Sequence, residues 1–164
     1  MRRFWAMILG IIVSAGLSAG ADLVQEVRHE LLLGRGYTVF DWITYRVDGG
    51  KVTLMGSVVS ADLKRDSGNA VKKIKGVSSV QNDIEVLPAS AGDERIRMGV
   101  LRSINDQMAV YLVQEVKQIH IIVKGGNVTL EGEIPGQADK DRVSALAKRV
   151  QDVSNVTNNL AILK

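Results

Sequence analysis

The stretch Asp48-Gly49-Gly50-Lys51-Val52-Thr53-Leu54-Met55-Gly56 occurs twice in this chain of 164 residues. It returns 76 positions later as Lys124-Gly125-Gly126-Asn127-Val128-Thr129-Leu130-Glu131-Gly132, with six of the eight residues from Gly49 to Gly56 unchanged. The same offset relates residues 45–87 to residues 121–163 without a gap, with 14 identities in 43 positions. A fixed offset of this kind indicates two copies of one small structural unit.

Each copy predicts a β-hairpin that turns at its Gly-Gly pair, because both central residues of a type I′ turn need positive φ. The turn residues are Gly49, Gly50, Gly125 and Gly126. The facing pairs would be Val47–Val52, Tyr45–Leu54 and Ile43–Gly56, repeated as Val123–Val128, Ile121–Leu130 and Ile119–Gly132. All of them fall on one side of the pleat, so the register and the apolar alternation agree. The inward Gly56 and Gly132 indicate close approach of a helix, or a bulge.

The remaining elements follow from apolar periodicity. Helical spacing predicts helices over residues 22–33, 61–75 and 137–151, and a further helix around Ile96, Val100 and Ile104. Alternation predicts one closing strand in each copy, over residues 80–86 and 156–162. The fold class is therefore α+β, with two tandem αββαβ units. Each unit would be a small three-stranded mixed sheet with two helices on one face. The predicted domains are residues 22–87 and 93–164, joined by a linker at 88–92.

The first 21 residues have the layout of a secretory signal peptide. Arg2 and Arg3 precede an apolar core, and Ala19-Gly20-Ala21 provides small residues at a cleavage site after about Ala21. The alternative is an uncleaved membrane anchor, but the apolar part is shorter than the roughly 20 residues that a spanning helix needs. We therefore expect a soluble periplasmic protein.

The composition argues against several kinds of site and partner. The chain contains no cysteine, which excludes disulfides, thiolate metal sites and a lipid attached through cysteine. The formal charge is +3, from 21 basic and 18 acidic residues, and two of the basic residues lie in the signal. This near balance is not typical of a nucleic-acid-binding protein, so we expect no nucleic-acid partner.

Aromatic residues gather at one place, with Tyr37, Phe40 and Trp42 close together and Tyr45 just beyond them. Amphipathic rings of this kind suit a recognition patch or a contact with a lipid interface. The alternative is ordinary packing, since small domains use aromatic side chains to close their cores.

Basic residues form a strip on the second helix of each copy. The strip comprises Lys64, Arg65, Lys72 and Lys75 in the first copy and Lys140, Lys148 and Arg149 in the second. It could contact anionic phospholipid headgroups at a membrane surface. Interleaved aspartates favour the alternative, that the strip is the solvated back of an amphipathic helix.

No catalytic constellation is present in the sequence. The two histidines, His29 and His120, have no shared context, and the register places His120 across from Glu131 on the outer sheet face. That pair could act as an acid–base dyad, but an exposed surface pair is the simpler interpretation. The sequence has no nucleophile elbow, phosphate loop or zinc-helix motif. We expect no enzyme activity, no cofactor and no metal site.

The chain resembles the BON family (bacterial OsmY and nodulation domains). The resemblance is carried by the G-G-x-V-T-L-x-G hairpin, the helix after it, and the closing strands at Val77–Val86 and Val153–Ile162. It implies αββαβ units and a role in envelope and osmotic stress, with binding to phospholipid or to other envelope proteins. Without an acylated cysteine, the chain looks like the soluble, osmotically inducible branch.

These observations favour a non-enzymatic periplasmic binding module. It would contact phospholipid at a membrane surface, or envelope proteins in a chaperone-like way, through the aromatic residues and secondarily the basic strip. The alternative is a structural or assembly protein that associates through open sheet edges or between domains. The sequence does not indicate an oligomeric state.

Overall fold

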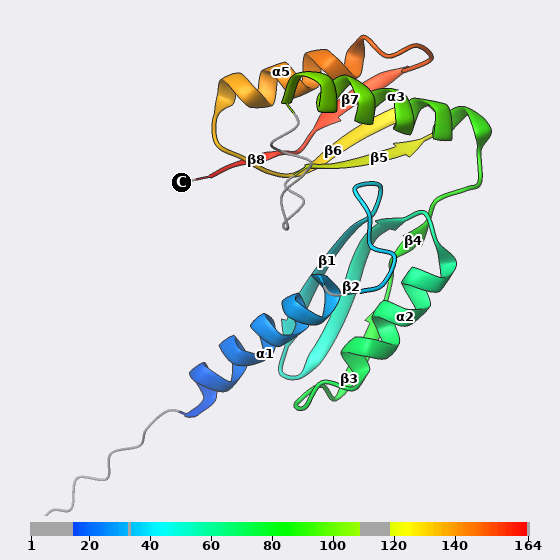
Figure 1. Cartoon of the computed structure of the whole chain (residues 1–164). Coiled ribbons are helices and arrows are strands. Elements are labelled where there is room, and N and C mark those ends of the chain that lie inside the picture. Colours follow the sequence, from blue (N-terminus) through cyan, green and yellow to red (C-terminus); the bar gives the residue numbers. More distant parts are fainter. Residues whose placement is uncertain (1–14, 33, 109–118, 164) are drawn as a thin grey trace, which may run out of the picture.

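The structure is a computed structural model that describes residues 15–32, 34–108 and 119–163. The first unit contains α1 (Ala15–Leu32), β1 (Trp42–Asp48), β2 (Lys51–Val58), α2 (Ala61–Lys72), β3 (Ser79–Asn82) and β4 (Glu85–Val86). The second unit contains α3 (Ala91–Met108), β5 (Ile119–Lys124), β6 (Asn127–Ile134), α5 (Gln137–Lys148), β7 (Asn155–Asn158) and β8 (Ala161–Ile162). Figure 1 shows the two units one after the other along the chain, each with its own sheet.

Both predicted hairpins are confirmed. The turn glycines have positive φ, at 52° and 87° for Gly49 and Gly50 and at 57° and 78° for Gly125 and Gly126. Val47 pairs with Val52 in the first antiparallel ladder, and the second ladder repeats the predicted register in full. The Gly-Gly turn therefore fixes which side chains face the helices in each unit.

Each sheet has four strands, because the predicted closing strand is interrupted. In the first unit β3 and β4 both run parallel to β2, one after the other along its far edge from β1. The side chain of Asn82 causes the break: it accepts the N–H of Ile84 at 3.3 Å and donates to the carbonyl of Lys64 on α2 at 2.7 Å. Asn158 makes the corresponding bonds in the second unit, at 3.1 and 2.9 Å. The asparagine thus ties the strand to the helix and turns the next aliphatic side chain into the core.

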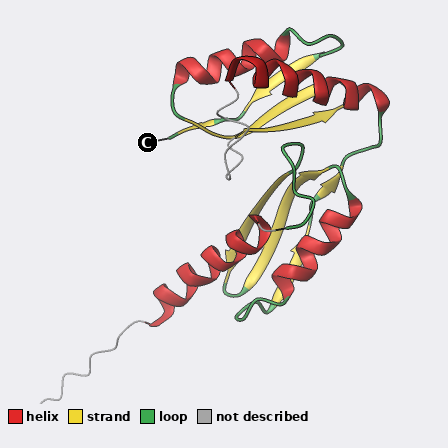
Figure 2. Ribbon diagram, viewed as in Figure 1, coloured by secondary structure: helices red, strands yellow, loops and turns green. Residues whose placement is uncertain are grey.

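The helices cover one face of each sheet, as Figure 2 shows, which confirms the two-unit α+β architecture. Apolar side chains between helices and sheet form a separate core in each unit. The first core includes Val27, Val52, Leu54, Val71 and Ile84, and the second includes Val100, Ile121, Leu130, Val143 and Leu160.

Several boundaries differ from those predicted. Helix α1 begins at Ala15, within the predicted signal and before the predicted start at residue 22; residues 1–14 of that signal lie outside the described residues. Helices α2 and α5 end at Lys72 and Lys148, three residues early, where single helical turns take over. The neighbour of Gly56 is not a helix. A Cβ there would overlap the main-chain oxygen of Trp42 on β1, so the glycine permits close approach of the two strands.

Candidate functional site

Residues 37–41, which we call the junction loop, connect α1 to β1 and are fixed by a buried carboxylate. Asp41 is fully buried. One of its oxygens accepts the N–H and the hydroxyl of Thr38, at 2.8 and 2.6 Å, and the other accepts the N–H of Val59 at 2.9 Å. Charge-assisted bonds of this kind are stronger than neutral ones. The loop is therefore held firmly against the end of β2.

The junction loop also contacts the second unit. The N–H of Ile121 on β5 donates to the carbonyl of Val39 at 2.7 Å. The partly buried ring of Phe40 packs against the core of the second unit rather than its own. An exposed ion pair between Glu85 on β4 and Lys124 on β5, 2.5 Å apart, lies at the same junction. The two units are thus joined by a main-chain bond, an aromatic side chain and a surface ion pair, in addition to the linker.

His120 lies at the centre of this junction. Its predicted cross-strand register with Glu131 is confirmed, but the expected exposed surface pair is wrong because His120 is only 3% exposed. The rings of Trp42 and Tyr37 lie 4.9 and 5.4 Å from the imidazole, centre to centre. Glu131 instead accepts a hydrogen bond from the side chain of Asn159 at 2.7 Å. The first unit therefore places two aromatic rings next to a buried histidine of the second unit.

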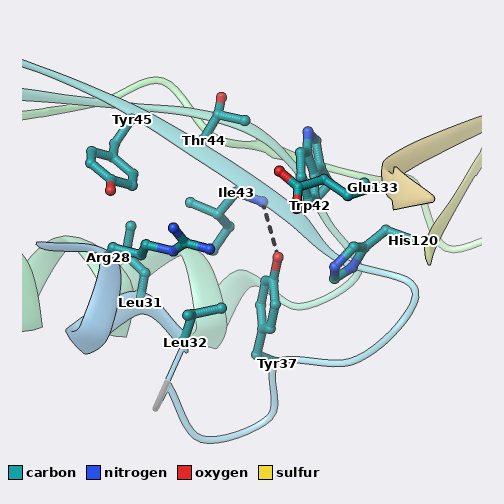
Figure 3. A pocket seen from close by; sticks show the side chains of 11 residues that line it. Arg28, Leu31, Leu32, Tyr37, Trp42, Ile43, Thr44, Tyr45, His120 and Glu133 are labelled. Atoms are coloured by element: carbon teal, nitrogen blue, oxygen red, sulfur yellow. Dashed lines mark hydrogen bonds between the residues drawn. The ribbon is translucent and has the colours of Figure 1, made fainter. Parts of the chain in front are cut away.

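A pocket of about 370 Å³, which we call the junction pocket, opens beside these rings, between α1, the edge of β1 and the second unit (Figure 3). Its size falls within the range usual for ligand sites. The pocket is lined by Arg28, Leu31, Leu32, Tyr37, Trp42, Ile43, Thr44, Tyr45, His120, Gly132 and Glu133. Apolar and aromatic side chains make most of the wall, and the exposed Arg28 and Glu133 bring one charge of each sign.

The two tyrosine hydroxyls of the pocket are held by main-chain groups. The N–H of Ile43 donates to the Tyr37 hydroxyl at 3.5 Å, and the Tyr45 hydroxyl donates to the carbonyl of Val24 at 3.0 Å. Burial raises the pKa of Tyr37 to about 12, with the N–H of Ile43 opposing and the charge of Asp41 adding to the rise. Burial likewise raises the pKa of Tyr45, against the nearby charge of Arg28. Both phenols stay neutral at physiological pH, which suits a neutral, apolar ligand surface.

The predicted aromatic residues have two different surroundings at this site. Tyr37 and Trp42 line the pocket, whereas Phe40 packs against the second core. All three are partly buried between the units, so the packing interpretation accounts for their position. Arg28, Leu32 and Glu133 also line the pocket and were not predicted, because no local sequence pattern brings α1 and β6 to the edge of β1.

The predicted basic strip lies away from the pocket. Within the described part of the chain, none of its seven residues lines the pocket. Arg65 is engaged by Asp62 and Asp66 at 2.6 and 3.0 Å, and the ammonium of Lys140 donates to the carbonyl of Leu160 at 2.6 Å. Lys75 lies in a groove between α1 and α2 whose charged residues have both signs: Glu26, Glu30 and Asp66 are acidic, and Lys73 and Lys75 are basic. Lys64 is partly buried, while Lys72, Lys148 and Arg149 are exposed.

Residues 15–32, 34–108 and 119–163 contain no group of three or more acidic, histidine or cysteine side chains placed to hold a metal ion. In the same residues, no helix combines the length and the apolar character that a membrane span requires.

Comparison with known proteins identifies the family. The model of the BON domain matches residues 21–88 and again residues 93–164. The osmotically-inducible protein Y of Escherichia coli (strain K12) is 28% identical over 121 residues, which are 72% of this chain and 60% of that protein. The chain thus spans about 60% of the length of this curated relative.

Two solved structures of CdsD, a structural protein of the type III secretion system of Chlamydia trachomatis, are also similar. They match 87% of this chain at 14% identity, with TM-scores of 0.36 and 0.34 and coverage of 98% and 92% of their own chains. The hairpin register, the paired asparagines and the two family matches agree, and the chain belongs to the BON domain family as a tandem member with two copies of the domain.

Proposed function

We propose that the chain is an exported, periplasmic, non-enzymatic binding protein that acts during osmotic and envelope stress. It contacts phospholipid or other envelope proteins, in the second case in a chaperone-like way, through the junction pocket. The signal-like first 21 residues and the similarity to osmotically-inducible protein Y support the compartment and the stress role. The observation that carries the binding role is the pocket itself.

The chemistry of the pocket supports an apolar ligand group. Its wall combines aliphatic side chains from α1 with aromatic side chains from the junction loop and β1, and its tyrosines are neutral. Leu32, at its edge, is 49% exposed. An acyl chain or an apolar amino-acid side chain would remove this surface from water, which is favourable by about 25 cal/mol for each Å² buried.

The exposed part of the basic strip supports a second contact, with anionic headgroups. Lys72 lies on the exposed side of α2 and has no ion-pair partner within the described residues. A lysine near an anionic membrane surface contributes about 1 kcal/mol of attraction before screening by salt. This contact would orient the protein on a membrane without filling the pocket.

Photo-crosslinking in osmotically stressed cells tests the pocket. A photoreactive amino acid would replace Thr44 in the pocket or, as a control, Gln81, which is exposed on β3 and outside the junction pocket. We expect lipid or envelope-protein adducts from position 44, and at most a small fraction of that yield from position 81. Equal yields from the two positions would remove the junction pocket from the proposal.

The basic strip is tested by flotation with vesicles of phosphatidylglycerol and of phosphatidylcholine. The exported protein would carry Lys72→Glu, and the control would carry Lys51→Glu, at an exposed position outside the strip. At low ionic strength we expect Lys72→Glu to weaken binding to the anionic vesicles by about fivefold or more. An unchanged affinity, with Lys51→Glu behaving alike, would discard the headgroup contact.

A further inference from the structure

Two main-chain groups on the outer edge of β5 are hydrogen-bonded to other groups of this chain. The N–H of Ile121 donates to the carbonyl of Val39 in the junction loop, at 2.7 Å. Two residues on, the carbonyl of Val123 accepts a hydrogen bond from the guanidinium of Arg97 on α3, at 3.0 Å. Both main-chain groups point away from β6, as alternate residues of an antiparallel edge strand do.

The outer edge of β1 is the equivalent place in the first unit, and no main-chain group of the described residues bonds it at Tyr45 or Val47. The offset of 76 makes Tyr45 and Val47 the counterparts of Ile121 and Val123. The N–H of Ile43 already points outward, to the hydroxyl of Tyr37, so Tyr45 and Val47 also direct their main-chain groups away from β2. Among the described residues, the main-chain groups of Tyr45 and Val47 have no hydrogen-bond partner at this edge.

The junction pocket lies along this same edge. It is lined by side chains from both faces of β1, Trp42 and Thr44 from one face and Ile43 and Tyr45 from the other. A strand placed beside β1 would direct alternate side chains toward the two faces of the sheet. One of these would point toward α1, where Leu32 forms the exposed wall of the pocket.

We propose that the outer edge of β1 takes up an extended segment of a partner polypeptide by strand addition, with an apolar or aromatic side chain seated in the junction pocket. This inference rests on the proposed function and names its partner as protein. In this mode main-chain hydrogen bonds supply affinity and a pocket for alternate side chains supplies selectivity.

The molecule contains its own example of this contact. The junction loop is an irregular segment whose Val39 carbonyl bonds the outer edge of β5, while the adjacent Phe40 enters the neighbouring core. A carbonyl of the partner segment would accept the N–H of Tyr45, as the carbonyl of Val39 accepts the N–H of Ile121. The pocket contains one charge of each sign, Arg28 and Glu133, and therefore no excess of positive charge that would select a phosphate, whereas a peptide brings the main-chain groups that an open strand edge can bind.

The test uses the exported protein, labelled for NMR, and two synthetic peptides. The first is acetyl-Lys-Thr-Val-Phe-Val-Thr-Lys-amide. The second has the same sequence with N-methyl groups on its three central residues, which removes main-chain donors and keeps every side chain. The amide of Tyr45 is the reporter, and the amide of Ile121, already bonded to Val39, is the internal control.

With saturating first peptide, we expect hydrogen exchange at Tyr45 to slow by about tenfold or more, as a new hydrogen bond requires. Exchange at Ile121 should stay unchanged, and the indole N–H signal of Trp42 should shift. The N-methylated peptide should bind at least about tenfold more weakly. Val47→Pro, which removes an outward N–H that an edge strand can spare, should weaken binding of the first peptide, while Val47→Ala should retain it.

Other results would overturn the inference. Equal binding of the two peptides, with a shift at Trp42, would show side-chain binding in the pocket without strand addition and would leave the proposed function standing. A response of Trp42 to phosphatidylglycerol vesicles and not to peptide would assign the pocket to lipid. Protection of Tyr45 that rises with protein concentration alone would assign the edge to a second copy of this chain. No response to any probe, together with equal crosslinking from positions 44 and 81, would end both proposals.

Discussion

The two units share a hydrophobic pattern and differ in their buried polar groups. Leu23, Val27 and Leu31 on α1 correspond to Ile96, Val100 and Ile104 on α3, and all six side chains are buried. However, α3 also carries Asp93 in its first turn and Arg97 next to Ile96, each only 4% exposed. The corresponding residues of α1 are Gly20 and Val24. The difference lies in what holds the first helix to its hairpin.

In the second unit, Asp93 binds the hairpin turn directly. Its two oxygens accept the N–H groups of Gly125 and Gly126, each at 2.9 Å, and Arg97 bonds the carbonyl of Val123. Burial alone would raise the pKa of Asp93, but the N–H groups of Gly126 and Gly125 and the charge of Arg97 together hold it below its usual value. Apolar repeats thus specify the fold in both units, and Asp93 and Arg97 add polar bonds to the hairpin of the second unit.

The largest expected effect comes from Asp93→Asn. The amide retains one acceptor, but its NH₂ group meets a turn N–H, and the negative charge near Arg97 is lost. We expect a loss of about 3 kcal/mol in the free energy of unfolding, measured by urea denaturation followed by circular dichroism. Asp106→Asn, at an exposed position on the same helix, should change the free energy of unfolding by less than about 0.5 kcal/mol. Similar small changes in both variants would mean that the hydrogen bonds of Asp93 to the turn do not stabilise the second unit.

A smaller loss is expected from Phe40→Ala, which removes the side chain that the first unit places against the second core. Because the ring is only partly buried, we expect a cost of about 2 kcal/mol, below the range for a full aromatic truncation. Hydrogen exchange at Ile121 should become faster in the same variant, since the loop is no longer held at β5. The control is Val59→Ala, at a position 38% exposed in the first unit. If exchange at Ile121 is the same in both variants, the units are not coupled through Phe40.

Acid should weaken the second unit through Asp93. Because its pKa is lowered in the folded protein, the stability that it contributes is fully present above the unfolded pKa of about 3.9. That contribution is lost as the pH falls through the lower folded pKa. We therefore expect the difference in unfolding free energy between the wild type and Asp93→Asn to narrow below about pH 4. A difference independent of pH from 2 to 7 would contradict the carboxylate's role.

The smallest effect is expected at the ion pair between Glu85 and Lys124. Both side chains are about half exposed, so their coupling should be about 0.5 kcal/mol and should fall in high salt. A double-mutant cycle with Glu85→Gln and Lys124→Gln measures it. A coupling above about 2 kcal/mol would indicate that this pair, rather than Phe40 and Val39, joins the units.

The local parts of the fold could be predicted from sequence, because turns and amphipathic elements depend on residues near one another. Gly49-Gly50 set the hairpin register, and the helical spacing of Leu23, Val27 and Leu31 located α1. The break between β3 and β4 was missed, since an alternating strand hides the side-chain bonds of Asn82 to Lys64 and Ile84.

The candidate site could be predicted only in part. Tyr37 and Trp42 were found because aromatic residues are few and lie together. His120 was expected on an exposed face. Its cross-strand register was predicted correctly, but the ring of Trp42 from the other unit lies against it, and the register does not indicate that contact. The bond of Ile121 to Val39 joins residues far apart in the chain, and neither periodicity nor charge indicates such a contact.

The bond between Val39 and Ile121 also has a consequence for biosynthesis. The proposed export would bring the chain across the membrane with its N-terminus first, and domains generally fold in the order in which they emerge. Val39 and Phe40 would then arrive before β5, and the arriving strand would meet the groups that contact it. Bare strand edges are where nascent chains adhere to one another. The earlier half of the molecule thus protects the later half at the moment when the later half is most prone to aggregate.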